Sequence, residues 1–360
     1  MINKHILLIG GANIEYIHKS KNDIRQGSKN FVEIEELFGG SGVNYALRLL
    51  TYGEVVFPIL FMGDDSTGRQ IHDALLPFAQ NANRTFFDED TFFVPTLTTP
   101  RSTIIVEGIH RTILSEDPNK ENIFQAFVAK RIEEAGEVGA LIIGHIHNDR
   151  QDINPNGQNL STLYALEHFK HKKTLIYANF GASQLDYGFG FWKPHLSKVD
   201  ILQLNIHELR NFLGNGTPCD LACLIKKIQD LSLTMIITLD KFGALGLMKD
   251  VKNTLFMARP FNDIEGFVDS TGAGDAFCAG MISKLKGKKH FAPEAFKEAM
   301  ERGRSWATYA CMSYGGANNC PSPTQVVAFH QEKTVGNEVV LYHDKAMQDV
   351  IALVDSMLEK

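Results

Sequence analysis

The sequence predicts an α/β fold in which helices flank a central, mostly parallel β-sheet. Short apolar runs that end in Gly, Asn or Asp recur along the chain, and a helical pattern follows each of them. Continuous apolar runs of this kind are typical of parallel strands that are buried on both faces. They occupy residues 5–13, 55–65, 139–149, 173–181, 199–208 and 234–243. Because ligands of such folds bind beyond the carboxyl ends of the strands, we expect functional residues where these runs end.

The composition is that of a globular protein. The chain has 360 residues, of which 44% are hydrophobic and 22% are charged. A chain of this length can bury a large core without disulfides or metals to hold it together. We therefore expect residues 1–360 to form one large α/β domain that carries an insertion.

Two segments in the first third of the chain interrupt the strand–helix rhythm. Residues 14–38 and 96–117, approximately, lack helical periodicity. The second segment predicts a hairpin, with the run STIIV, a turn at Glu107 and Gly108, and the run HRTIL. We expect both segments to form a small β-sheet that covers the strand ends as a lid. Near the C-terminus, apolar residues at helical spacing predict a packed helix over residues 344–360.

Charge and hydropathy exclude several classes of partner. The net charge is −6 and no long basic run is present, so we expect no nucleic-acid partner. No run of about 18 apolar residues occurs, so we expect no membrane span, and the N-terminal apolar run predicts a strand rather than a signal peptide. Five sparse cysteines favour a reduced, cytoplasmic protein. Cys219 and Cys223 lack a second pair, so a zinc site is not expected.

Residues 268–281 read VDSTGAGDAFCAGM and carry the strongest chemical signal. Gly272 and Gly274 let backbone N–H groups approach an anion closely, and a helix that begins there adds its positive dipole end. A carboxylate in an anion pocket would repel a bound phosphate, so its presence indicates a separate function. Asp275 is suited to act as the general base that takes the proton of an attacking hydroxyl. The N–H groups of Ala273, Gly274 and Asp275 would then stabilise charge on a transferring phosphoryl group. A helix cap after a Gly-rich turn is the structural alternative.

Four segments of the chain resemble one family of phosphotransferases. Other phosphate motifs are missing, since neither GxxxxGK[ST] nor a strand–GxGxxG–helix unit occurs. The segments are STGAGDAFCAGM at 270–281, FGGSGVNYALRLLTYG at 38–53, FMGDDSTGRQI at 61–71 and LNIHEL at 204–209. They resemble signatures of the PfkB, or ribokinase-like, carbohydrate kinases, and their order and spacing fit over roughly residues 5–323.

This resemblance implies a ribokinase-like fold and ATP-dependent phosphorylation of a hydroxyl on a sugar or nucleoside, with ATP and Mg²⁺ as cofactors. It implies that Asp275 is the catalytic base and that Gly272, Ala273 and Gly274 form the anion hole. The implied substrate-side residues are Glu15, Gly39, Gly40, Asn44 and Asp275, and the implied nucleotide-side residues are Asn205, Glu208, Thr238, Asp240, Gly243, Gly272 and Gly274. Glu208 would hold Mg²⁺ through water.

Three positions depart from the family pattern. Glu15 stands where members commonly carry Asp to hold substrate hydroxyls, and it is longer by one methylene. Asp240 stands where a glycine usually lies beside the ATP phosphates, so it must point away or meet Mg²⁺ or Lys241. Gly181 stands where an arginine is common. A substrate that carries a carboxylate or phosphate would then need another cation, and Arg101 in the lid could supply it, as could Arg111.

The family resemblance also implies a potassium site and a dimer. Asp269, Thr271 and the backbone near Gly316 match the places that hold a monovalent cation behind the anion hole, and Cys320 stands where a serine often contributes. A homodimer through the lid is the implied assembly. His145 and His147 lie two residues apart at a strand end, where we expect hydrogen-bonded or substrate-facing side chains.

The favoured function is therefore ATP-dependent phosphorylation of a sugar or sugar derivative. A nucleoside kinase acting on adenosine, inosine or pseudouridine is the alternative within enzymes. A kinase-like fold that only binds a ligand is a third hypothesis, which Asp240 favours and the intact GAGD at 272–275 opposes.

Overall fold

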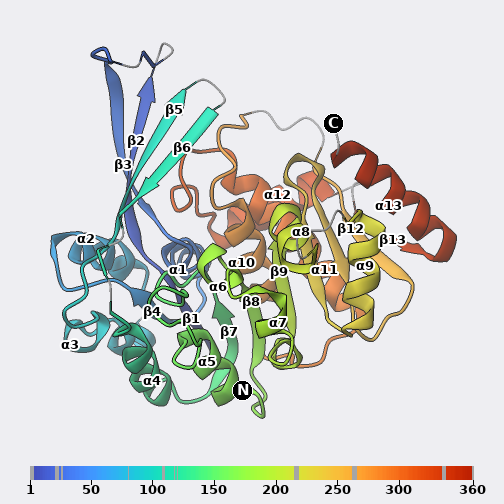
Figure 1. Ribbon diagram of the computed structural model, residues 1–360, viewed down its shortest axis with the longest axis horizontal. Coiled ribbons are helices and arrows are strands. Elements are labelled where there is room, and N and C mark those ends of the chain that lie inside the picture. Colours follow the sequence, from blue (N-terminus) through green and yellow to red (C-terminus); the bar gives the residue numbers. More distant parts are fainter. Residues whose placement is uncertain are drawn as a thin grey trace.

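A nine-stranded sheet forms the centre of the protein in the computed structural model (Figure 1). The structure describes residues 4–20, 24–25, 27–79, 81–107, 110–116, 118–119, 121–214, 219–261, 266–334 and 338–358. The strand order is β13-β12-β11-β10-β9-β8-β7-β1-β4. Its parallel strands are β1 (His5–Gly11), β4 (Val56–Phe61), β7 (Val138–Ile143), β8 (Leu175–Asn179), β9 (Ile201–Asn205) and β10 (Met235–Thr238). All six predicted strands are confirmed, and each pairs in parallel with its neighbours among the six.

One edge of this sheet is antiparallel and was not predicted. It consists of β11 (Ala244–Leu247), β12 (Thr254–Ala258) and β13 (Val340–His343). These strands are only four or five residues long, and β13 is partly exposed. Short strands without a clear apolar run give little periodic signal, because the sheet pairing itself stabilises them.

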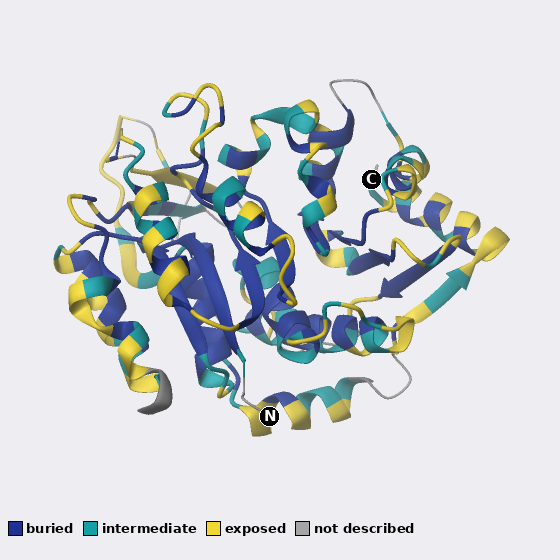
Figure 2. Cartoon of the chain, turned by 90° about the horizontal axis from the view of Figure 1, so that it is seen from below, coloured by how far each residue is buried: buried dark blue, intermediate teal, exposed yellow. Residues whose placement is uncertain are grey.

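Helices cover both faces of the large sheet. They are α1 (Ser41–Thr51), α2 (Ser66–Leu75), α3 (Glu89–Phe92), α4 (Phe124–Glu134), α5 (Ser161–Phe169), α6 (Ala182–Leu185), α7 (Gly188–Trp192), α8 (Ile206–Gly214), α9 (Leu221–Asp230), α10 (Ala273–Leu285), α11 (Pro293–Ala310), α12 (Pro323–Thr334) and α13 (Asp344–Leu358). Two clusters of buried apolar side chains fill the spaces between sheet and helices. The buried strands and the exposed outer faces of the helices are visible in Figure 2. The predicted C-terminal helix is present as α13, with Met347, Ile351 and Val354 buried.

The two insertions form a separate four-stranded sheet, as predicted. Its order is β3-β2-β5-β6, from β2 (Asn13–Ser20), β3 (Val32–Gly39), β5 (Arg101–Glu107) and β6 (His110–Ser115). The hairpin of β5 and β6 is antiparallel and pairs Glu107 with His110, whereas Gly108 of the predicted turn lies outside the described residues. The sheet projects from the α/β body beside α1 and α2 (Figure 1). We call it the lid.

The Gly63–Asp65–Gly68 motif fixes the base of the lid. The Asp65 carboxylate accepts hydrogen bonds from the N–H of Gly68 at 2.8 Å and the N–H of Thr99 at 2.8 Å. Added Cβ atoms at Gly63 and Gly68 would collide with the backbone of Leu97 and of Gly63, respectively. The glycines are therefore needed for close backbone approach, and the aspartate joins the start of α2 to the chain that enters β5.

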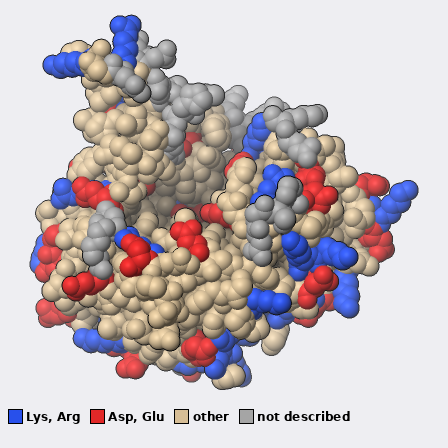
Figure 3. Space-filling model, in the orientation of Figure 1, with Lys and Arg blue, Asp and Glu red and all other residues tan. Residues whose placement is uncertain are grey.

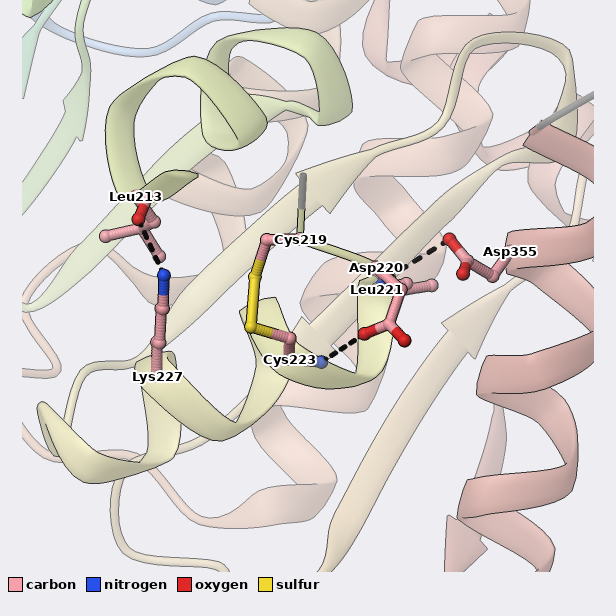
Figure 4. The surroundings of a disulfide bond; sticks show 7 residues. All are labelled: Leu213, Cys219, Asp220, Leu221, Cys223, Lys227 and Asp355. Carbon is pink, nitrogen blue, oxygen red and sulfur yellow. Dashed lines mark hydrogen bonds between the residues drawn. A yellow bond between two sulfur atoms is a disulfide. The ribbon is translucent and has the colours of Figure 1, made fainter. Parts of the chain in front are cut away.

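The expectation of fully reduced cysteines is not met. Cys219 and Cys223 form a disulfide at the start of α9 (Figure 4). The Asp220 carboxylate accepts a hydrogen bond from the N–H of Cys223 at 2.7 Å and so turns the chain into the helix. This turn brings the two Cα atoms to 5.7 Å, within the range that a disulfide needs. No helix in the described ranges is long and apolar enough to cross a membrane.

Candidate active site

The predicted anion pocket forms a left-handed turn at the N-terminus of α10. Gly272 has φ 70° and ψ 7°, a conformation that glycine adopts without a steric penalty. Its carbonyl accepts the N–H of Ala276 at 2.8 Å, which starts the helix. The N–H of Ala273 donates to the carbonyl of Ser270 at 3.1 Å, so this donor is engaged within the turn. The helix N-terminus therefore presents its positive end where the sequence predicts phosphate.

Asp275 and Asn44 meet across this turn although 231 positions separate them in the chain. Nδ2 of Asn44 donates to Oδ2 of Asp275 at 2.7 Å, a length typical of a hydrogen bond to a charged acceptor. Asn44 lies in the first turns of α1, and its side chain is buried. Its Oδ1 atom has no hydrogen-bond partner within the described ranges. A buried acceptor of this kind can receive a hydroxyl of a bound molecule.

Three glycines allow this close approach. Gly40 precedes α1 with φ 87°, and an added Cβ there would lie 2.6 Å from the carbonyl oxygen of Gly11. A Cβ at Gly316 would collide with the amide of Asn44. A Cβ at Gly272 would lie 2.6 Å from Cα of Gly316. The two predicted signatures and the 313–317 loop are thus packed against one another, and this loop holds the Asn44 side chain in place.

Glu15 and Gly39 lie side by side at the base of the lid. They belong to the antiparallel pair β2 and β3, where Glu15 is opposite Leu37 and Gly39 is opposite Asn13. A Cβ at Gly39 would collide with the carboxyl group of Glu15. The longer glutamate therefore uses the space that this glycine leaves. The structure thus brings Glu15 and Gly39 together.

Asn205 and Glu208 form a reciprocal cap at the start of α8. The N–H of Asn205 donates to Oε2 of Glu208 at 2.9 Å, and the N–H of Glu208 donates to Oδ1 of Asn205 at 2.8 Å. This is a capping box, which explains the Asn-x-x-Glu spacing by local stability. Burial raises the pKa of Glu208, and the negative charge of Asp275 raises it further, whereas the Asn205 N–H and the charge of His145 lower it. Glu208 and Asp275 therefore share one electrostatic environment.

The segment after β10 supplies a second turn on the nucleotide side. Thr238 ends β10 and pairs in register with Asn205 on β9. Asp240 has φ 49° and Gly243 has φ 94°, and a Cβ at Gly243 would collide with the carbonyl of Ala258. The exposed Asp240 carboxylate lies 3.7 Å from Nε2 of His207. Its side chain meets this histidine rather than the predicted Lys241.

Carboxylate oxygens in this region match the ligand chemistry of Mg²⁺. Glu208 and Asp240 follow the adjacent parallel strands β9 and β10, at the same edge of the sheet. Mg²⁺ prefers oxygen ligands and usually keeps several waters. These two residues therefore fit the binding of hydrated Mg²⁺.

His145 occupies the space that the missing arginine would need. A Cβ at Gly181 would lie 2.7 Å from Cγ of His145, so the glycine makes room for the imidazole. The N–H of His145 donates to Oγ of Ser41 at 2.9 Å, and its carbonyl accepts the N–H of Gly11 at 2.8 Å. His147 is exposed and packs near Gly11. The described residues contain no group of three His, Cys, Asp or Glu side chains that could hold a metal ion.

Asp269 binds the loop that follows α11. Its Oδ1 accepts the N–H of Thr271 at 3.1 Å and the Thr271 hydroxyl at 2.7 Å. Its Oδ2 accepts the N–H of Gly315 at 3.0 Å. The carboxylate thus joins the turn before α10 to the 313–317 loop.

The lid touches this same loop. Nζ of Lys19 on β2 lies 3.5 Å from the centroid of the Tyr314 ring and also pairs with Glu35 at 2.5 Å. A Cβ at Gly315 would lie 2.6 Å from Cδ1 of Leu37 on β3. Between the lid and the body the surface is hollowed (Figure 3). Of the two lid arginines expected as anion ligands, Arg101 is exposed, and the side chain of Arg111 lies outside the described residues.

Sequence reasoning missed two buried polar residues of the site. Gln203 on β9 donates to the carbonyl of Gly274 at 2.9 Å and accepts the Tyr177 hydroxyl at 2.7 Å. Arg48 on α1 is fully buried and donates to the carbonyls of Gly316 and Asn44. A glutamine inside the apolar run ILQLN, and an arginine one turn after Asn44 on an apolar helix, are signals that could have identified both.

Comparison with known proteins supports this arrangement over part of the chain. Residues 193–325, from the end of α7 to the start of α12, match the pfkB family carbohydrate kinases, which confirms the resemblance for this segment. An ATP-dependent 6-phosphofructokinase of Thermoanaerobacterium thermosaccharolyticum is 30% identical over 149 residues. That match spans 41% of this chain and 42% of the length of the phosphofructokinase.

Solved structures show the same fold over nearly the whole chain. The nucleoside kinase of Burkholderia thailandensis in complex with inosine has a TM-score of 0.66 at 16% identity, and the match covers 93% of this chain and 99% of that one. The ribokinase of Arabidopsis thaliana in complex with ribose and ATP has a TM-score of 0.64 at 16% identity, covering 92% and 99%. The predicted ribokinase-like fold is therefore confirmed.

Proposed function

We propose that this protein transfers the γ-phosphate of ATP to a hydroxyl group of a sugar or sugar derivative. The observation that carries the proposal is the position of Asp275 in the first turn of α10, where Asn44 of the other signature donates to its carboxylate at 2.7 Å. A carboxylate at a helix N-terminus suits the deprotonation and orientation of a hydroxyl when it lies beside a buried amide oxygen that no described residue hydrogen-bonds.

In the proposed mechanism, Asp275 takes the proton of the acceptor hydroxyl. Asn44 orients the carboxylate through Nδ2 and receives a second hydroxyl of the acceptor at Oδ1, while Glu15 binds the acceptor from the lid side. The N–H groups of Gly274 and Asp275 in the first turn of α10 stabilise negative charge that develops on the transferring group. ATP, when bound, supplies the phosphoryl group, and Mg²⁺ neutralises charge on its phosphates. Thr238, Gly243 and Gly274 would line the nucleotide side, and Glu208 and Asp240 would hold the hydrated ion.

The proposal treats residues 1–360 as one catalytic domain, with lid insertions at approximately 14–38 and 96–117. Closing of the lid over the hollow would exclude water, which would otherwise compete with the acceptor. The lid also exposes the apolar side chains of Ile34, Ile113 and Leu114. We include a homodimer through this surface in the proposal, and a cytoplasmic location, where ATP is abundant.

The experiment is an ADP-release assay with ATP and Mg²⁺ against sugars, sugar acids, sugar phosphates and nucleosides, with Asp275→Asn in parallel. Turnover with a sugar-type acceptor that the variant loses would support the proposal. Turnover with nucleosides alone would favour the nucleoside kinase. Binding of ATP without transfer to any acceptor would instead indicate a ligand-binding protein.

A further inference from the structure

Arg48 is a buried cation directly behind the anion pocket. Its side chain is 0% exposed. Nη1 donates to the carbonyl of Gly316 and, at 3.3 Å, to the carbonyl of Asn44. Its Nε and Nη2 atoms have no hydrogen-bond partner within the described ranges. A guanidinium keeps its charge in proteins, and burying it without a paired carboxylate costs free energy. We therefore expect this buried charge to have a functional role.

The residues matched to a monovalent-cation site do not fit a bound potassium ion. Both carboxylate oxygens of Asp269 already accept hydrogen bonds, from Thr271 and Gly315. The carbonyl of Gly316 is taken by Arg48. Cys320, in the place of a serine, offers sulfur rather than oxygen and donates to the carbonyl of Ala317 at 3.1 Å. Hard cations prefer oxygen ligands, so the Cys320 thiol adds no ligand for potassium, whereas the Arg48 guanidinium already bonds to the Gly316 carbonyl.

The contacts connect Arg48 to the reacting end of α10 in two steps. Gly316, which accepts from Arg48, packs against Gly272, so closely that a Cβ on Gly272 would lie 2.6 Å from Cα of Gly316. Asn44, one helical turn before Arg48 on the same face of α1, donates to Asp275. The guanidinium therefore holds two parts of the pocket in position: the 313–317 loop and the Asn44 side chain.

The charges of Arg48 and Asp269 also meet around Cys311. Burial raises the pKa of Cys311 to about 11, with the charge of Asp269 raising it further and that of Arg48 lowering it. Arg48 and Asp269 thus lie within electrostatic reach of one thiol, and both bond to the 313–317 loop, Asp269 through the N–H of Gly315 and Arg48 through the carbonyl of Gly316. The positive charge of Arg48 therefore offsets the negative charge of Asp269 near this thiol.

We propose that the Arg48 guanidinium takes the place of a monovalent cation behind the anion pocket, so that the activity needs no potassium. Arg48 is a positioning residue in this proposal, because it acts through Gly316 and Asn44 and does not touch the substrate. The inference rests on the proposed kinase function for its activity readout.

The test compares the wild-type chain with Arg48→Ala, Arg48→Met and Arg48→Lys. ADP release and the melting temperature are each measured at constant ionic strength in choline chloride, potassium chloride and low, non-denaturing guanidinium chloride. Arg131→Ala is the matched control, since Arg131 is also buried and donates to a backbone carbonyl, that of Phe86, at 3.1 Å.

The wild type should turn over equally, within about twofold, in choline and in potassium. Arg48→Ala and Arg48→Met should lose about tenfold or more in turnover, because a nearby unit charge alters a charged transition state by this order. Guanidinium or potassium should restore several-fold of the loss in Arg48→Ala and raise its melting temperature. Arg48→Lys should keep most of the activity, and Arg131→Ala should respond to neither cation.

Several results would overturn the inference. One is activation of the wild type by potassium of about tenfold or more, which is the response of a working cation site. Others are full activity of Arg48→Met, or an Arg48→Ala protein that responds to neither cation by rate or by melting temperature. If no acceptor turns over with the wild type, the kinase proposal fails, whereas the cation response of the melting temperature still decides the role of Arg48.

Discussion

Replacing Asn44 by Asp is the sharpest perturbation of the proposed site. The change is nearly isosteric, but it exchanges the donor Nδ2 for an oxygen that faces Oδ2 of Asp275 at the present distance of 2.7 Å. Loss of a hydrogen bond to a charged group costs about 1.5–3 kcal/mol. Two like charges 4 Å apart repel by a further ~4 kcal/mol at an effective dielectric constant of about 20. The two carboxylates will therefore share a proton near neutral pH.

This proton removes the base that the mechanism requires. We expect kcat/KM of Asn44→Asp to fall about 100-fold or more at pH 7, within the range that general-base catalysis contributes. Raising the pH should recover part of the loss, because the shared proton then leaves. The KM for ATP should change little, since the contact lies on the acceptor side.

The assay is the pH profile of kcat/KM for wild type, Asn44→Asp and Asn44→Ala with the acceptor found in the panel. Asn44→Ala removes the hydrogen bond without adding a charge, so its activity should fall with no displacement of the acid limb toward higher pH. An Asn44→Asp protein with wild-type activity and an unchanged profile would refute the contact between Asn44 and Asp275 as part of catalysis.

Three further predictions concern stability and the space beside the site. Burial raises the pKa of Asp149 from 3.8 to about 6. The unfolding free energy should therefore fall by about 3 kcal/mol as the pH rises from about 4 to above 6. Urea titrations at several pH values measure this slope, which Asp149→Asn should flatten. Reduction of the Cys219–Cys223 disulfide, which closes a loop of a few residues, should lower the unfolding free energy of the wild type by about 2 kcal/mol but leave that of Cys219→Ser unchanged. Gly181→Ala should displace the His145 imidazole and raise KM for the acceptor, and adding His145→Ala should relieve its clash, as measured by a double-mutant cycle of melting temperatures.

The parallel strands could be predicted because each is a continuous apolar run with a polar end. The lid hairpin could be predicted because its two runs flank a turn signal of two residues. By contrast, β11 is stabilised by pairing with β10, and β12 by pairing with β11, rather than by a pattern of their own. The sequence favoured reduced cysteines because a Cys-x3-Cys pair alone does not show that a helix cap will bring the sulfurs together.

The site residues were predictable where one segment carries the signal. The GAGD turn and the Asn205–Glu208 spacing are local, and the latter forms a capping box. The contact of Arg48 with Gly316 spans 268 positions, so no local pattern could reveal it. The same holds for the fit of His145 over Gly181, which depends on two neighbouring strands ending at the same edge.

The central claim is that Asp275 is the base of a phosphoryl transfer from ATP. The most direct measurement pairs calorimetric binding of ATP with product formation for wild type and Asp275→Asn. The account predicts ATP affinities within about threefold of each other and turnover of the variant reduced by about 10²–10⁴-fold, the contribution of a general base. Equal turnover of the two proteins, or no ATP binding by the wild type, would contradict it.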